Sequence, residues 1–228
     1  MSNKTHSVLD AAQSGRLGSV HIGQTETVLL KDNFWISETR LAPFQELFLE
    51  GKTVGWEYDF RPYFILKLFE SADDKVINEI EFPLPTQSEL SDYNTNSYVP
   101  FTEEFLRELG VSDFLSEFGF CVDICGLYQG LRLLDCDDLL VGHRLKVMRA
   151  EFHDDCSEEF WLRVDGNLEL VFGRDEDMGW KNFELVRARL VLENSGIERV
   201  TVDLGVAASG WAKGLETQID LQSPENSG

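Results

Sequence analysis

The chain has 228 residues, of which 43% are hydrophobic and 11% aromatic, so it can bury a core and is not a disordered protein. Its 41 acidic and 20 basic residues give a net charge of −21, which disfavours unassisted binding to DNA, RNA or anionic lipid, because these are polyanions. No run of about 20 apolar residues is long enough to span a membrane, and residues 1–12 lack a signal-peptide core. We therefore expect a cytoplasmic protein without membrane or direct nucleic-acid contact.

The N-terminal third shows alternating strand patterns after a short helix. Residues 1–14 are small and polar, and we expect a loose arm there. Thr25 is placed to cap a helix over residues 26–30. Strands are then predicted at residues 56–60, 64–69 and 76–82.

Two segments of this third carry a family resemblance. Residues 15–26 read GRLGSVHIGQTE, and residues 56–60 read WEYDF. Over residues 15–82 the chain resembles small bacterial immunity-like proteins encoded beside polymorphic toxins, in which a glycine-bounded opening precedes a helix and an aromatic strand. The resemblance implies an immunity or inhibitory role.

A polar stretch is predicted to divide the chain. Pro83 and Pro85 precede a run over residues 86–97 that has neither helix nor strand period. We therefore expect two modules, at residues 15–84 and 100–217, with flexible tails at residues 1–14 and 218–228.

The second module is predicted to begin with two short helices, capped by Thr102 and Ser112 and ended by Gly110 and Gly119. Strands are expected at residues 120–128, 131–134 and 139–152. They would extend the sheet to which the following hairpin belongs.

The clearest local signal is a hairpin over residues 160–172. Apolar residues alternate with polar ones on both sides of the turn Asp165-Gly166-Asn167. A helix is predicted next, over residues 183–193, because Phe183, Val186 and Leu190 fall three and four apart. A strand over residues 197–204 follows, so the whole pattern predicts an α+β protein with mostly antiparallel sheets and a few short covering helices.

This region carries a second resemblance. Residues 168–174 read LELVFGR, and residues 202–204 read VDL. Both resemble the β-domain of bacterial division proteins of the FtsQ/DivIB type. We interpret the likeness as a shared order of strand, helix and strand.

Sites for metals or catalysis lack the necessary spacing. The chain has the zinc-ligand types His143, His153, Cys136 and Cys156, beside Asp154 and Asp155, but no chelating pair. Cys121 and Cys125 are separated by three residues, which on a strand places their side chains too far apart to bind one ion comfortably. We expect free thiols, no metal and no cofactor. No nucleophile elbow, phosphate loop or dinucleotide turn is present, so we predict that the protein is not an enzyme.

Acidic residues flank the hairpin on both sides. Before it come Glu151, Asp154, Asp155, Glu158 and Glu159, and after it come Asp175, Glu176 and Asp177. A two-stranded antiparallel ribbon brings both groups to the end opposite its turn. They are either solvated surface or an anionic docking edge.

Aromatic residues supply the other candidate contacts. Trp35, Trp56 and Tyr58 belong to a cluster that forms either core or anchors for a partner. We predict an acidic protein-binding module, and the most concrete version of this prediction is an immunity or inhibitor protein that occludes a basic partner such as a toxin. Two alternatives stay open: a small hydrolytic enzyme using carboxylates, and a structural assembly protein.

Overall fold

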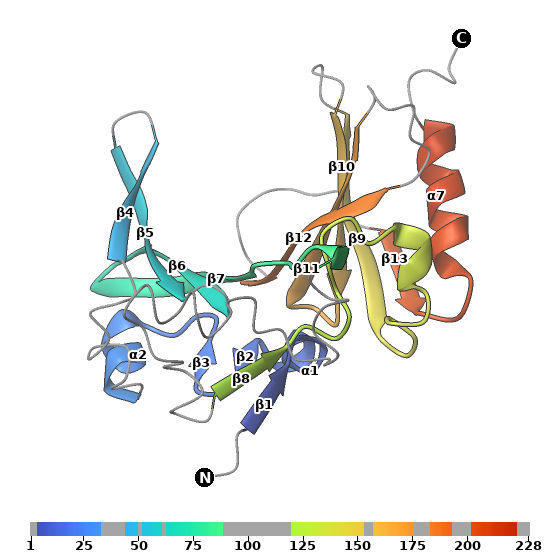
Figure 1. Ribbon diagram of the computed structural model, residues 1–228. Helices are drawn as coiled ribbons and strands as arrows, with labels where there is room; N and C mark the ends of the chain where they lie inside the picture. Colours follow the sequence, from blue (N-terminus) through green and yellow to red (C-terminus); the bar gives the residue numbers. More distant parts are fainter. Residues whose placement is uncertain are drawn as a thin grey trace.

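The protein has an α+β fold built on a large antiparallel sheet, as the sequence predicted (Figure 1). The computed structural model describes residues 4–32, 44–49, 52–60, 63–88, 120–152, 157–175, 183–192 and 202–222. Within these ranges the main sheet has nine strands, and every neighbouring pair is antiparallel. In order across the sheet they are β13 (Val202–Val206), β9 (Arg144–Phe152), β10 (Ser157–Val164), β11 (Leu168–Asp175), β12 (Glu184–Val191), β7 (Asp74–Phe82), β6 (Phe64–Ser71), β5 (Lys52–Phe60) and β4 (Phe44–Leu49).

The strands of the two predicted modules lie in this one sheet. The junction is the pairing of β12 with β7, which runs from Ala188 opposite Phe82 to Val191 opposite Glu79. The predicted boundary at residues 83–100 lies mostly outside the described residues, and so do the helices expected after Thr102 and Ser112. The division into modules stays a prediction.

The hydrophobic core lies against one face of the sheet. Helices α1 (Val8–Ser14) and α2 (Glu26–Asp32) both lie on this side, α1 against β11 and α2 against β7 (Figure 1). Alternate strand residues point into the core, among them Leu66, Ile80 and Leu170, which are fully buried. Away from the bulges, the period of two along the strands therefore explains which side chains the helices cover.

The first residues differ from the loose arm that we expected for residues 1–14. Residues 4–14 form strand β1 (Lys4–Ser7) and helix α1. The Ser7 hydroxyl accepts a hydrogen bond from the Asp10 N–H at 3.1 Å, which caps the helix. Strand β1 pairs in parallel with β8 (Phe120–Asp123), more than a hundred residues away, so local sequence gives no sign of it.

Helix α2 and strands β5, β6 and β7 confirm the helix predicted at residues 26–30 and the strands predicted at residues 56–60, 64–69 and 76–82. Thr25 Oγ1 accepts the Val28 N–H at 3.4 Å, and the helix begins at Glu26. Strands β5, β6 and β7 contain the three segments that the alternation predicted. The short strands β2 (Arg16–Leu17) and β3 (Val20–His21) form a small hairpin before them.

The central hairpin is also confirmed. Strands β10 and β11 pair from Val164 opposite Leu168 to Ser157 opposite Asp175. Asp165 and Gly166 both have positive φ, at 49° and 97°, which the turn between the two strands requires. Asn167 Nδ2 donates to the carbonyls of Ala12 and Gln13, so the turn also holds the end of α1.

The helix predicted over residues 183–193 is wrong, because residues 184–191 form strand β12. The ladder with β11 shifts register here: Val171 faces Arg187, and Phe172 faces Leu185. Val186 is the extra residue of this bulge and is 46% exposed. The bulge places buried Leu185 and Ala188 three residues apart, which imitates the spacing of a helix face.

Three further segments differ from prediction. The strand expected at residues 120–128 ends at Asp123, and residues 131–134 contain the start of a 3-10 helix, η1 (Leu133–Cys136), in place of a strand. The C-terminal helix α7 (Trp211–Gln222) was not predicted, and it includes residues 218–222, which we expected to be a tail. Its buried residues Ala212, Leu215 and Ile219 have helical spacing, but the polar residues between them make the apolar periodicity too weak to predict a helix.

Gly55 in β5 is expected to tolerate no side chain. A Cβ added there would lie 2.7 Å from the backbone oxygen of Leu68 on the neighbouring strand. Because backbone cannot move aside cheaply, Gly55→Ala should lower the free energy of unfolding by about 1–3 kcal/mol, measured by urea denaturation. Gly214→Ala is the matched control, since an added Cβ in α7 meets nothing within 4 Å. It should stabilise the protein by about 0.5–1 kcal/mol, and equal effects of the two changes would contradict this account.

Candidate functional site

The acidic end of the central strands is the first candidate site. We use this name for Glu151, Glu158, Glu159 and Asp175, whose positions the structure describes. Glu159 lies opposite Glu151 in the ladder of β9 and β10, and Ser157 lies opposite Asp175 in that of β10 and β11. Three neighbouring strands therefore bring these four residues to the end of the hairpin opposite its turn. Asp154, Asp155, Glu176, Asp177 and Trp35 lie outside the described residues.

The second candidate site surrounds Trp56 and Tyr58, on β5. Both side chains are half-buried, whereas Phe60 and Phe64 of the same aromatic cluster lie in the core. The Lys75 ammonium lies 4.5 Å from the centre of the Trp56 ring and 3.2 Å from Glu26 Oε2. Tyr58 donates its hydroxyl proton to Glu26 Oε1 at 2.8 Å. Burial, together with this bond to Glu26, raises the pKa of Tyr58, so the phenol stays protonated.

These groups border an open pocket of about 460 Å³, which we call the Trp56 pocket. Its walls are Glu26 on α2, Trp56 on β5, and residues 70–75 at the turn between β6 and β7. Asp74 fixes the turn to the helix, since its carboxylate accepts the N–H groups of Thr27 at 3.2 Å and Lys75 at 2.7 Å. Hydrogen bonds from Thr27 and Lys75 hold the pKa of Asp74 below its ordinary value.

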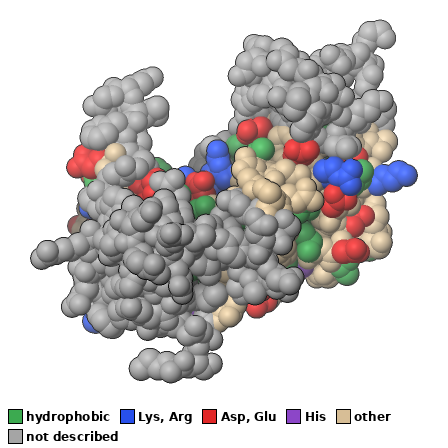
Figure 2. Space-filling view, in the orientation of Figure 1, with side chains coloured by type: hydrophobic (Ala, Val, Ile, Leu, Met, Phe, Trp, Pro, Cys, Tyr) green, Lys and Arg blue, Asp and Glu red, His purple; other side chains and the backbone are tan. Residues whose placement is uncertain are grey.

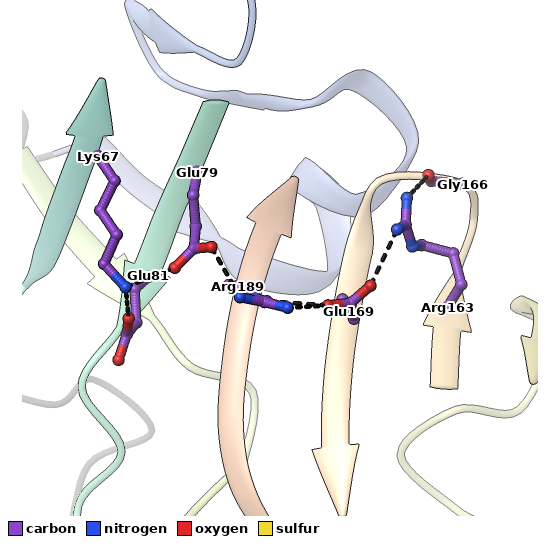
Figure 3. Close-up of polar contacts among 7 residues, drawn as sticks. All are labelled: Lys67, Glu79, Glu81, Arg163, Gly166, Glu169 and Arg189. Carbon is purple, nitrogen blue, oxygen red and sulfur yellow. Dashed lines mark hydrogen bonds and ion pairs between the residues drawn. The ribbon is translucent and has the colours of Figure 1, made fainter. Parts of the chain in front are cut away.

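A row of alternating charges crosses five strands on the face of the sheet opposite the core (Figure 3). This charge row consists of Lys67 on β6, Glu79 and Glu81 on β7, Arg189 on β12, Glu169 on β11 and Arg163 on β10. Arg189 reaches Glu79 at 2.7 Å on one side and Glu169 on the other. Arg163 contacts the second Glu169 oxygen at 2.9 Å and donates to the Gly166 carbonyl at 3.0 Å.

The charge row becomes more buried toward the hairpin. Glu169 is fully buried and Arg163 is 2% exposed, whereas the Lys67 side chain is 22% exposed. Burial acts to raise the pKa of Glu169, but the positive charges and hydrogen bonds of Arg189 and Arg163 outweigh it and hold the pKa below its ordinary value. A carboxylate held ionised by two guanidinium groups is a poor general base.

Sequence reasoning missed the charge row, although one signal was present. Arg163 and Glu169 stand at equal distances from the three-residue turn, and strand pairing places them directly opposite each other. An opposite-charge pair at such positions on a hairpin predicts a contact. The partners on β12 and β7 gave no comparable signal, because β12 was predicted as a helix.

The residue types suited to zinc do not gather. His143 Nδ1–H donates to Asp165 Oδ2 at 2.6 Å, and Arg144 N–H donates to Asp165 Oδ1 at 2.8 Å, which fixes the hairpin turn. Burial, with nearby Asp135 and Asp137, raises the pKa of Cys136 to about 12, so it remains a thiol. Among the described residues, no group of three His, Cys, Asp or Glu side chains is placed to hold a metal.

Cys125 and Cys136 form no disulfide, whereas the side chain of Cys121 and all of Cys156 and His153 lie outside the described residues. None of the helices in the described ranges has the length and apolar composition to cross a membrane.

Comparison with known proteins gives no relative from which a function can be transferred. No protein-family model matches the chain, and the comparisons with curated proteins and with solved structures found no match.

Proposed function

We propose that this is a cytoplasmic bacterial protein that binds a basic protein partner, as an immunity or inhibitor protein would, and that it is not an enzyme. The observation that carries this proposal is the strand register at the acidic end. It places Glu151, Glu158, Glu159 and Asp175 at neighbouring strand ends, with Glu159 directly opposite Glu151. Like charges at opposed positions repel, and a cationic surface docked there would relieve that repulsion.

The distribution of cations supports the same proposal. Several described cations are already paired with carboxylates inside this chain, namely Lys67, Lys75, Arg132, Arg163 and Arg189. Figure 2 shows acidic side chains across the width of the coloured surface in that view. Exposed carboxylates of the described residues, among them Asp10, Asp32 and Asp138, would attract a basic partner over distances of about a Debye length.

The mechanism would be occlusion. A protein that binds nucleic acid or phosphate does so with lysine and arginine side chains, and carboxylates on an opposing surface would pair with those same groups. Electrostatic steering would make association fast at low salt, and the polar contacts would then cover the partner's cationic site. Inhibition would follow without any chemical step by this protein.

The test is an association-rate measurement with the basic protein that an affinity capture recovers. Changing Glu151, Glu158 and Glu159 to Gln and Asp175 to Asn removes four carboxylates, which takes the net charge from −21 to −17. We expect the association rate at low salt to fall about tenfold and its dependence on salt concentration to become flatter, because steering charge is lost.

A matched variant separates the acidic end from net charge. Asp10, Asp32 and Asp138 changed to Asn, with Glu46 changed to Gln, lose the same charge at exposed positions elsewhere. This control should lower the rate by less than about twofold. Equal losses in both variants would show that the acidic end has no special part, and an unchanged rate in the first would overturn the proposal.

A further inference from the structure

The Trp56 pocket already holds one cation in a geometry that recognises cations. Lys75 lies over the Trp56 ring at 4.5 Å and pairs with Glu26 at 3.2 Å, so the pocket offers an aromatic face and a carboxylate to the same ammonium group. These two elements are the ones by which proteins bind ammonium and guanidinium groups. Lys75 occupies the ring as an internal ligand.

The pocket carries more negative charge than Lys75 balances. Four carboxylates, those of Glu26, Glu70, Asp73 and Asp74, line it together with this single cation. Glu70 and Asp73 are exposed and make no ion pair with another described residue. The rim therefore has two carboxylates without an ion pair to a described residue, although Glu70 stands opposite Lys75 in the β6–β7 ladder, beside an open space of about 460 Å³.

The walls of the Trp56 pocket are already held in place, which favours binding of an external ligand. The turn that bears Glu70 and Asp73 is fixed to the first turn of α2 through Asp74, and the Gly23 N–H donates to the Ile77 carbonyl at 2.7 Å. The pocket walls are therefore joined by hydrogen bonds between α2, the preceding loop and β7. A ligand would pay little to order them, since the site is already formed.

We propose that the Trp56 pocket binds an arginine side chain of the basic partner, a statement that rests on the proposed function for the source of that side chain. A guanidinium group stacks flat on an indole ring and presents paired N–H donors to carboxylates, which a lysine ammonium does not do. The arginine stacks on Trp56 and pairs with Glu70 and Asp73 at the rim. Lys75 competes with it for the ring and sets the affinity.

The experiment is a fluorine-19 NMR titration of the full chain labelled with 5-fluorotryptophan. The Trp56 resonance is assigned as the one that is absent from the spectrum of Trp56→Phe. The probe is a capped Gly-Arg-Gly peptide, and the matched ligand is the same peptide with citrulline, which keeps the shape and removes the charge. We expect a saturable shift of the Trp56 resonance with the arginine peptide and none with the citrulline peptide. The absence of a saturable shift, or equal shifts with both, would overturn the proposal.

Variants then test the two parts of the pocket. Lys75→Gln should tighten binding of the arginine peptide about fivefold, because the internal competitor is gone. Glu70→Gln with Asp73→Asn should weaken it about fivefold, whereas Asp10→Asn with Asp138→Asn should change it less than about twofold. Equal weakening by the two double variants, or no tightening in Lys75→Gln, would show that the pocket is not the site.

Failure here and failure of the proposed function are distinguishable. The peptide titration reports on Trp56 with a defined probe, whereas the association rate reports on the acidic end with the captured protein. If the variant without the four carboxylates associates at an unchanged rate while the arginine peptide still binds, only the proposal for the acidic end is refuted. If that variant associates more slowly but the peptide does not bind, only the proposal for the Trp56 pocket is refuted.

Discussion

Replacing Glu169 with Gln is expected to lower the free energy of unfolding by about 3–5 kcal/mol, one of the largest losses available in this chain. Glu169 is fully buried between Arg163, at 2.9 Å, and Arg189. The substitution keeps the shape of the side chain but leaves two guanidinium groups in the sheet without their shared negative charge. Urea denaturation followed by tryptophan fluorescence measures the loss.

Two comparisons make this prediction specific. Glu46→Gln changes an exposed glutamate on β4 and should alter stability by less than about 0.5 kcal/mol. Replacing Arg163, Glu169 and Arg189 together with leucine or methionine should restore part of the loss, since no buried charge is then left unpaired. A small effect of Glu169→Gln alone would mean that water reaches this part of the charge row.

The pH dependence of stability follows from the same residue. Because Arg189 and Arg163 hold the pKa of Glu169 below its ordinary value in the folded state, the unfolded chain takes up the proton first on acidification. The stabilisation is therefore complete above the ordinary glutamate pKa and is lost as pH falls toward the lowered value. Between about pH 6 and pH 3, Glu169→Gln should show a shallower fall in stability than the unaltered protein.

Local patterns predicted the parts of the fold that depend on neighbours in sequence. The β10–β11 hairpin followed from alternation on either side of Asp165-Gly166-Asn167, and α2 followed from Thr25 before an apolar run. In both cases the residues that decide the structure lie within a few positions of each other. Strand β1 and helix α7 were missed, because β1 pairs with the distant strand β8 and α7 packs against η1.

The error at β12 has a specific physical cause. A strand with a bulge loses its period of two, and the extra residue Val186 shifts Leu185 and Ala188 to a spacing of three. The composition of residues 184–191, with valine and leucine beside arginine, fits a strand paired on both sides. Whether these residues form a helix or a strand is decided by pairing with the neighbouring strands β11 and β7, whose positions come from the tertiary fold.

The candidate sites were predictable to different degrees. Sequence alone brought Glu151, Glu159 and Asp175 to one end of the hairpin, because antiparallel pairing fixes which residues meet. The Trp56 pocket was not predictable as a site, since it joins α2 to the β6–β7 turn. Trp56 and Tyr58 were identified as candidates, but the roles of Glu26 and Lys75 depend on the packing of α2 on β7.

Phe160→Ala should cost about 3–5 kcal/mol of unfolding free energy, because it removes the aromatic centre of the core. Phe160 is 1% exposed and stands directly opposite Phe172, with ring centres 5.1 Å apart in a stacked arrangement. Phe183 meets it edge-on at 4.9 Å, just before β12 begins. One ring therefore joins three consecutive parts of the sheet, and its loss leaves a cavity that stiff neighbouring strands cannot fill.

The comparison is with Phe160→Leu and with Val186→Ala. Leucine retains most of the apolar volume and should cost about 1–2 kcal/mol, whereas Val186 is an exposed bulge residue whose truncation should cost less than about 0.5 kcal/mol. Urea midpoints at constant slope measure all three variants. If Phe160→Ala cost no more than Val186→Ala, the stacked rings would not be the centre of the core, and the hairpin would have to draw its stability from the charge row on its other face.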